Sequence, residues 1–140
     1  MRIFKGTRAF TLIELIFAIV IIGILAALAI PRFFQTIEKS RSAEAVNILQ
    51  ALRDAQEVYY LEYNGVYADT PGDLDVTIPV SRNFEVPTVS DSPEPVASIE
   101  RDASGYQYTL TIDTDGMVCC IGTAPANICA ILGYPGGTCN

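Results

Sequence analysis

The chain contains no histidine and has far fewer basic than acidic side chains. Its 140 residues include 9 Lys and Arg against 16 Asp and Glu, which gives a formal net charge of −7. Without histidine, the commonest general base and metal ligand is missing. The acidic surplus argues against nucleic-acid binding, which requires a basic face. Because no nucleophile–base pair, phosphate-binding loop or metal-ligand cluster is recognisable either, we predict no enzymatic activity, cofactor or metal.

Charged residues are also absent from Leu15 to Ile30. Together with residues 10–14 this apolar run reaches the roughly 20 residues that a membrane-spanning helix needs. Its one charge, Glu14, is costly in that position, by about 2.5–3.5 kcal/mol on insertion scales, so we predict a function for it. The preceding segment, residues 1–9 (MRIFKGTRA), carries three basic residues and no acidic one. The positive-inside rule predicts that this segment stays in the cytoplasm and that the rest of the chain is exported.

Glycine and proline are absent between Pro31 and Gly65, and the pattern of this stretch is helical. Apolar residues recur there every three or four positions, at Ala45, Ile48, Leu49, Leu52, Ala55 and Tyr59. We therefore expect one helix from about Phe10 to about Tyr63, ended by Asn64-Gly65. Its first half is apolar all round, and its amphipathic second half carries a globular head. Pro31 removes one helical hydrogen bond, which predicts a kink.

The remainder of the chain predicts a small antiparallel β head. Residues 68–103 look irregular, with short edge strands possible at residues 76–80 and 84–89. Residues 106–113 (YQYTLTID) alternate as a strand does, Asp115-Gly116 is a hairpin signal, and residues 117–121 can form the return strand. Residues 122–140 form a tail rich in glycine and proline. The fold class is therefore α+β: a long N-terminal helix, an antiparallel sheet and a disulfide-bonded tail.

The four cysteines, Cys119, Cys120, Cys129 and Cys139, lie in the exported part and are expected to form disulfides. A redox-catalytic role lacks the usual CxxC spacing. Adjacent cysteines of a strand point to opposite faces, so a bond between Cys119 and Cys120 is disfavoured. Each of these two then pairs with Cys129 or Cys139. Cys120–Cys129 with Cys119–Cys139 is the weakly preferred arrangement, and the sequence leaves the alternative open.

The N-terminal pattern resembles that of type IV pilins and of the related pseudopilins of type II secretion. These proteins have a basic leader, a small residue before the cleavage site, Phe first and Glu fifth in the mature chain, and Gly and Pro at set places in an apolar helix. The matching residues here are Ala9, Phe10, Glu14, Gly23 and Pro31. The resemblance covers nearly all of FTLIELIFAIVIIGILAALAIP. Ala9 stands where the family usually has Gly.

This resemblance implies a course of maturation and assembly. A prepilin peptidase would cleave between Ala9 and Phe10 and the Phe10 amine would be methylated. Loss of the three leader cations would change the net charge from −7 to −10. Glu14 would pair with the Phe10 ammonium of a neighbouring copy, and the Gly23–Pro31 stretch could loosen during assembly. The expected partners are further copies of the chain, the peptidase, an inner-membrane assembly platform and the membrane before assembly.

The expected organisation follows from these assignments. Residues 1–9 are the leader, 10–31 the hydrophobic transmembrane and polymerisation helix, 32–64 its amphipathic continuation, and 65–140 the head with its disulfide region. The precursor would lie in the inner membrane, and the assembled protein in an extracellular pilus filament. One alternative is a pseudopilin of a secretion system, although pseudopilins often lack a C-terminal disulfide loop. Another is a monomeric signal-anchored surface protein, and a conventional signal cut near residues 26–29 is a third.

Two further patterns have plainer explanations. Asp113, Asp115 and Gly116 loosely resemble a calcium loop, but the remaining ligand positions are missing, and a hairpin turn accounts for all three. The tyrosines that end the helix invite a hypothesis of charge transport, and helix-to-sheet core packing is the preferred interpretation. They are Tyr59, Tyr60, Tyr63 and Tyr67.

Overall fold

A single long helix, α1 (Leu12–Glu62), dominates the computed structural model, which describes residues 10–137 and Cys139. Its 51 residues confirm the helix expected from the sequence to within two residues at each end. The chain divides into two units, of which the first ends at Thr36 and the second is Ile37–Asn140. The leader, including Ala9, lies outside the described residues. Pro31 is inside the helix, and the kink expected there stays a prediction.

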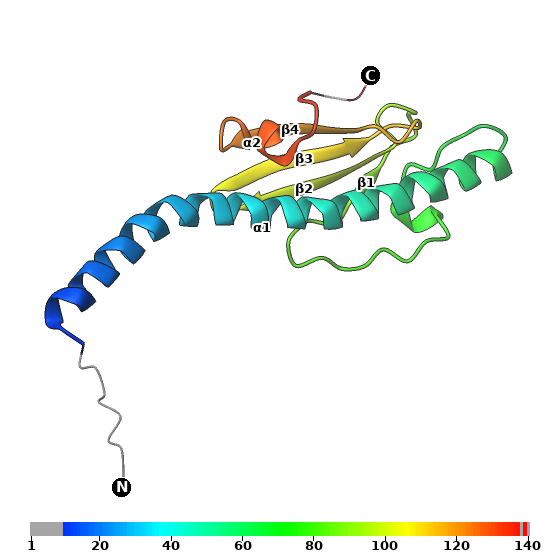
Figure 1. Cartoon of the computed structure of the whole chain (residues 1–140). Coiled ribbons are helices and arrows are strands. Elements are labelled where there is room, and N and C mark those ends of the chain that lie inside the picture. Colours follow the sequence, from blue (N-terminus) through cyan, green and yellow to red (C-terminus); the bar gives the residue numbers. More distant parts are fainter. Residues whose placement is uncertain (1–9, 138, 140) are drawn as a thin grey trace, which may run out of the picture. The chain divides into compact units, whose positions relative to one another are not determined.

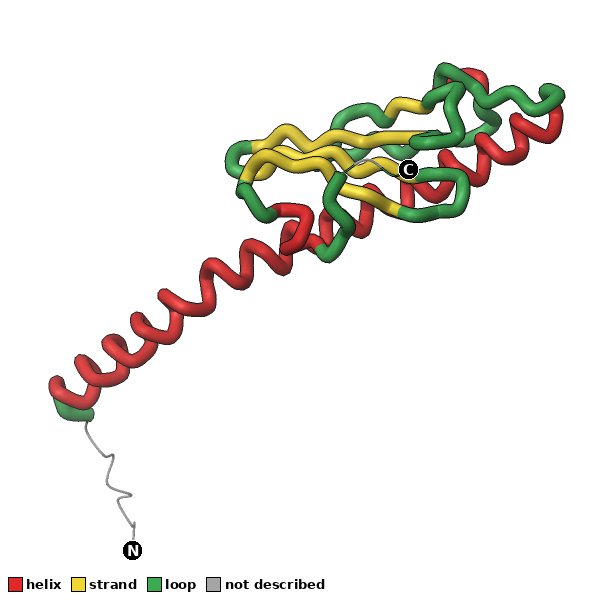
Figure 2. The backbone as a smooth tube through the Cα atoms, turned by 90° about the horizontal axis from the view of Figure 1, so that it is seen from above, coloured by secondary structure: helices red, strands yellow, loops and turns green. Residues whose placement is uncertain are grey.

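The second unit contains an antiparallel sheet that lies along the later part of α1 (Figure 1). Its strands follow the chain order β1 (Thr88–Val89), β2 (Ala97–Ala103), β3 (Tyr106–Ile112) and β4 (Val118–Ala124). The hairpins β2–β3 and β3–β4 turn at Gly105 and Gly116, whose φ angles of 86° and 84° favour glycine. The predicted strand–turn–strand of residues 106–121 is therefore confirmed. Figure 2 shows the same meander from above.

Strand β2 corrects the expectation that residues 68–103 are irregular. Its inward positions are Ala97, Ile99 and Arg101. Because a charged residue occupies the third of them, the apolar alternation that marks a strand is broken in the sequence. The prediction of an edge strand at residues 76–80 was wrong, because these residues form a loop. A short 3₁₀ turn at Pro71–Asp73 precedes this loop. Of residues 84–89, only Thr88–Val89 form a strand.

The C-terminal tail also contains an unexpected element, the short helix α2 (Ile128–Leu132). Five residues are too few to nucleate a helix alone, so α2 depends on tertiary contacts. Ile128 and Leu132 are buried, and Gly133 ends the helix with a φ of 90°. A Cβ at Gly122 would overlap the Ile128 side chain, so glycine at this position of β4 allows α2 to lie close against the strand.

Both disulfides attach the tail to β4. Cys119 bonds Cys139 and Cys120 bonds Cys129, which is the arrangement the sequence weakly preferred. The backbone adds a further connection, because Cys120 N donates to Pro135 O at 2.9 Å and Gly137 N donates to Cys120 O at 2.9 Å. The tail thus pairs with part of the sheet edge that would otherwise offer open hydrogen-bonding groups.

The core of the second unit lies between α1 and the sheet. Large apolar side chains from α1, β2, β3 and α2 are fully buried there, among them Leu49, Leu52, Ile99, Leu110, Ile112 and Leu132. The polar residue Gln56 is also buried, and its amide connects the end of α1 to the loops. It donates to Ala68 O at 2.8 Å and Ser90 O at 3.2 Å and accepts from Ala68 N at 2.8 Å.

The tyrosines at the end of α1 follow the expected core packing only in part. Tyr59 and Tyr67 pack against the core, as predicted. Tyr60 and Tyr63 are 38% and 54% exposed, so for these two the prediction was wrong. They instead stack on the half-buried pair, Tyr63 on Tyr59 with ring centroids 4.0 Å apart and Tyr60 on Tyr67 at 4.6 Å.

In the second unit, a buried charge cluster joins the part of α1 that directly follows Ile37 to strands β2 and β3. The Glu38 side chain is 1% exposed and pairs with Arg101, which is 5% exposed. Tyr108 Oη donates to Glu38 Oε1 at 2.9 Å, and Arg41 Nη1 lies 3.2 Å from Glu38 Oε2. Burial, together with this hydrogen bond, raises the pKa of Tyr108 far above its usual value. The phenol therefore remains a hydrogen-bond donor at all physiological pH values.

We expect Glu38→Gln to destabilise the protein by about 3 kcal/mol or more. The substitution preserves shape but leaves the Arg101 guanidinium buried without its counter-charge, and breaking a buried ion pair typically costs about 3–5 kcal/mol. Urea denaturation of the detergent-solubilised full chain, followed by circular dichroism, measures the change in the free energy of unfolding.

Glu57→Gln is the matched control for this prediction. Glu57 Oε1 accepts from Arg53 Nη2 at 2.7 Å, but the Glu57 side chain is 49% exposed and the Arg53 side chain 25%. Exposed ion pairs contribute about 1 kcal/mol or less. Equal losses in the free energy of unfolding for the two variants would show that the Glu38 cluster does not hold the helix to the sheet.

Candidate assembly site

Glu14 lies in the first turn of α1, and Phe10 lies two residues before the helix begins; both side chains are exposed. Thr11 precedes the first helical residue, and its Oγ1 accepts from the Glu14 backbone N at 3.3 Å. This is half of a capping box, in which Thr caps the helix and Glu occupies its third position. The signal was present in the sequence as Thr-x-x-Glu and could have located the helix start. The helix dipole also favours a carboxylate in this first turn.

Within one chain, Glu14 has no cationic partner among residues 10–137 and Cys139. Phe10 is 76% exposed, and while the leader remains attached its nitrogen is an uncharged amide. Cleavage before Phe10 would convert this nitrogen into an ammonium group. The Glu14 carboxylate and the Phe10 ammonium that cleavage would create have opposite charges. Neighbouring copies of the chain could therefore pair these two groups with each other.

The first part of α1, on both sides of Glu14, exposes apolar side chains on every face. Its most apolar 18-residue window has a mean hydropathy of 3.0, and none of that window is buried inside the structure. The exposed side chains include Leu12, Phe17, Ile22, Leu25, Leu28 and Phe33. A helix that is apolar all round requires burial in lipid or protein. By length and composition, this is the one helix in the described residues able to cross a membrane.

Gly23 and Pro31 lie within this apolar stretch of α1, which is helical throughout. A Cβ added at Gly23 would meet nothing within 4 Å, so no contact of the described chain requires glycine there. The two residues weaken the helix locally, Gly by about 1 kcal/mol and Pro by removing a hydrogen bond. The structure does not bring them into contact with Phe10 or Glu14.

The other candidate residues lie in the second unit and have structural roles. Asp113 is buried and its Oδ1 accepts from Met117 N at 2.8 Å, as a turn between β3 and β4 requires. Within the part of the chain that the structure describes, no group of three or more His, Cys, Asp or Glu side chains could hold a metal ion. The four cysteines are all in the two disulfides.

Comparison with known proteins connects this geometry to a family. The family model "Prokaryotic N-terminal methylation motif" matches residues 4–30. Type II secretion system core protein G of Escherichia coli is 33% identical over 116 residues, covering 83% of this chain and 72% of that protein. Type IV major pilin protein PilA of Myxococcus xanthus is 49% identical over 55 residues, covering 39% of this chain and 25% of that protein.

A fimbrial protein of Pseudomonas aeruginosa is 39% identical over 75 residues, covering 53% of this chain and 49% of that protein. The matches to the pilin and the fimbrial protein thus span half or less of those proteins, whereas the match to core protein G extends into the head. No solved structure matches the chain significantly. On the motif, the extended match and the fold of a long apolar helix with a small antiparallel sheet, the chain belongs to the family of type IV pilins and type II secretion pseudopilins.

Proposed function

We propose that the protein is a structural subunit of a type IV pilus-like surface filament. The observation that carries this proposal is the first unit of the chain, in which an exposed apolar helix begins with a carboxylate that has no cationic partner among the described residues. Within a single copy, the described residues neither cover this helix nor neutralise Glu14. A bundle of copies can do both, because apolar helices bury one another and each Glu14 meets a Phe10 ammonium.

In this proposal the precursor is held in the inner membrane by residues 10–31, with the leader in the cytoplasm. Prepilin peptidase removes residues 1–9 and the Phe10 amine is methylated, which the methylation-motif match to residues 4–30 supports. Mature copies then polymerise through an inner-membrane assembly platform. Residues 32–64 continue the helix into the head of residues 65–140, and the heads form the extracellular surface.

A pseudopilin of a type II secretion system is the second candidate. It is favoured by the match to core protein G, which extends over 72% of that protein and therefore beyond the N-terminal motif. The two C-terminal disulfides favour the pilin. Long filaments sheared from the cell surface are expected for a pilin, and short periplasmic assemblies for a pseudopilin.

We expect protein sheared from cells to begin at Phe10 and to carry one additional methyl group. Its intact mass should also show the loss of hydrogen that accompanies formation of both disulfides. Intact-mass spectrometry with N-terminal peptide sequencing measures all three features. A membrane-bound chain that still begins at Met1 would contradict processing at Ala9–Phe10 and would favour a monomeric anchored protein.

We expect Glu14→Ala to reduce the yield of sheared filaments by about tenfold or more. Removing one partner of a desolvated ion pair costs several kcal/mol, and every 1.4 kcal/mol is about a factor of ten in an association constant. The matched control is Glu94→Ala, which removes an exposed carboxylate of the head.

The length of filaments is measured by electron microscopy and the N-terminus by mass spectrometry, so that loss of assembly is separated from loss of cleavage. If Glu14→Ala is processed and assembles as well as Glu94→Ala, charge pairing does not drive polymerisation.

A further inference from the structure

The described part of the first unit carries two charges, one near each end of its apolar helix. Between residues 10 and 36 the charged side chains are Glu14 and Arg32. The part of α1 that separates them is about 27 Å long, at a rise of 1.5 Å per residue. The hydrocarbon layer of a membrane is about 30 Å thick, so a helix that spans it holds these two charges near opposite boundaries.

Arg32 has no ionic partner within the described chain. Its side chain is exposed and forms no ion pair with any residue that the structure describes. The residues one helical turn away on either side, Leu28, Ala29, Gln35 and Thr36, carry no charge. Thr36 Oγ1 donates to Arg32 O at 3.0 Å, a contact that does not involve the guanidinium group. This group is therefore available to an anion outside the described chain.

The orientation of the helix in a membrane does not explain a cation at this place. The positive-inside rule puts Lys and Arg on the cytoplasmic side, where the leader is expected. Arg32 instead follows the apolar stretch at its opposite end. An uncharged residue there would give the same orientation, so Arg32 needs another explanation.

Arg32 also interrupts the apolar surface before that surface ends. Phe33 and Phe34 follow it, are 62% and 56% exposed, and place their rings edge to face with centroids 6.3 Å apart. Successive helical residues point about 100° apart, so the three side chains face different directions around α1. Side chains of a helix lean toward its N-terminus, which directs both Phe rings back toward the hydrocarbon layer. With an apolar residue in place of Arg32, the apolar stretch would run on through Phe34.

We propose that Arg32 binds the phosphate of a phospholipid headgroup at the outer face of the inner membrane. The proposal rests on the membrane-held precursor of the function proposed above and assigns Arg32 a role in it. A guanidinium group matches the geometry of phosphate oxygens, and its long stem can lie along hydrocarbon while the charged head reaches the headgroups. Because a charge inside the hydrocarbon layer is costly, Arg32 opposes movement of the helix toward the cytoplasm.

The length of the apolar helix favours a lipid as the partner. Helix α1 begins at Leu12, and the rise from Leu12 to Arg32 is about 30 Å, which equals the thickness of the hydrocarbon layer. With Leu12 at the inner boundary, Arg32 therefore reaches the outer boundary, where the phosphates of the lipids lie. Lipid surrounds this position in the precursor before a second copy is bound.

A fixed position of Arg32 at the outer boundary also sets the depth of Glu14. The start of the helix then holds Glu14 about 3 Å inside the hydrocarbon layer, where an unpaired charge is costly. A helix displaced by two residues toward the cytoplasm would bring this carboxylate to the boundary, where water hydrates it. Arg32 thus keeps Glu14 in the environment that most favours pairing with the Phe10 ammonium after cleavage.

The depth of a tryptophan near Glu14 tests this assignment. The chain contains no tryptophan, so Phe17→Trp adds a single reporter within the apolar stretch. The full chain, with its leader, is reconstituted into vesicles of phosphatidylcholine and phosphatidylglycerol whose acyl chains carry bromine at a shallow or a deep position. Bromine quenches tryptophan fluorescence at short range, so the ratio of the two quenching values measures the depth of the reporter.

We expect Arg32→Leu to move this reporter about 3 Å toward its nearer boundary, which is the rise of two residues. The apolar stretch then extends through Phe34, so quenching by the shallow bromine should increase and quenching by the deep bromine should decrease. Arg32→Lys retains the cation and should leave the depth unchanged. Arg82→Leu is the matched control, because it makes the same substitution at an exposed arginine of the head.

Native mass spectrometry of the detergent-solubilised chain measures binding of phosphatidylglycerol to the same variants. One basic residue near a membrane surface changes the affinity for anionic lipid by about fivefold. Arg32→Leu should therefore bind phosphatidylglycerol about fivefold more weakly than the unaltered chain, whereas Arg32→Lys and Arg82→Leu should bind it nearly as well. Intact mass establishes for each variant that both disulfides have formed.

The outcomes separate this assignment from the function on which it rests. If neither brominated lipid quenches the reporter when Arg32 is present, α1 does not enter the bilayer, and the membrane-held precursor fails together with the assignment. If the reporter is quenched but Arg32→Leu changes neither depth nor lipid binding, the assignment is wrong and the precursor stands.

The yield of sheared filaments identifies the alternative partner. If Arg32→Leu lowers this yield while depth and lipid binding are unchanged, a neighbouring copy is the partner of Arg32 and the lipid assignment is wrong. If the unaltered chain forms no filament, the filament function fails, and the vesicle measurements still decide the assignment.

Discussion

The structure depends on one constraint: helix α1 carries an apolar surface that the described residues of the chain do not cover. From Leu12 onward this surface is exposed on all sides, and the first buried side chain of α1 is Glu38, in the second unit. The same continuous helix must therefore serve two environments, one provided by lipid or other copies and one by its own sheet. Because burial of apolar area is the dominant favourable term in association, the first environment makes assembly the natural fate of the chain.

The head has the opposite problem, which is to stay folded with a small core. It combines three devices: a helix-to-sheet core, the buried Glu38–Arg101–Tyr108 cluster, and two disulfides that attach the tail to β4. The disulfides contribute about 2–4 kcal/mol each in the usual account. The core and the buried cluster hold the amphipathic half of α1 against the sheet, and the disulfides hold the tail against β4.

Charge acts at the start of the helix in the proposed filament. Glu14 and the Phe10 nitrogen, which cleavage would turn into an ammonium group, are exposed on the same chain. In the proposed filament these two groups meet between copies. Such a contact between unlike groups of identical copies extends into a helical polymer when the rotation between copies does not close.

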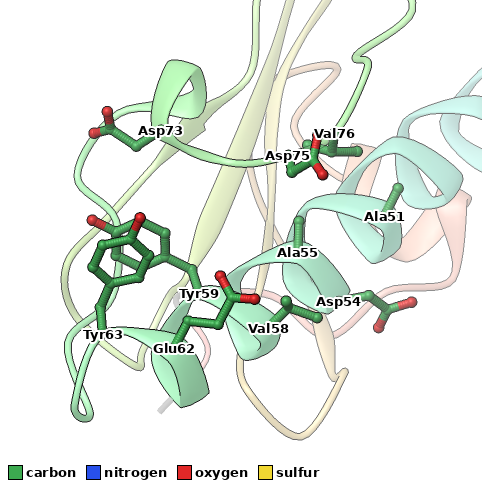
Figure 3. A pocket seen from close by; sticks show the side chains of 10 residues that line it. All are labelled: Ala51, Asp54, Ala55, Val58, Tyr59, Glu62, Tyr63, Asp73, Asp75 and Val76. Carbon is green, nitrogen blue, oxygen red and sulfur yellow. The ribbon is translucent and has the colours of Figure 1, made fainter.

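The sequence by itself determined the long helix, the two strands of residues 106–121 and the Phe10–Glu14 pattern, because each depends on local periodicity or a short motif. Strand β2 and helix α2 were decided only by tertiary structure. In β2, Arg101 can point inward because Glu38, 63 positions earlier in the chain, neutralises its charge. Helix α2 is held in place by the Cys120–Cys129 disulfide and by the space that Gly122 leaves for it. The groove between the last turns of α1 and the segment from Asp73 to Val76 was equally hidden, since the fold brings its two walls together (Figure 3).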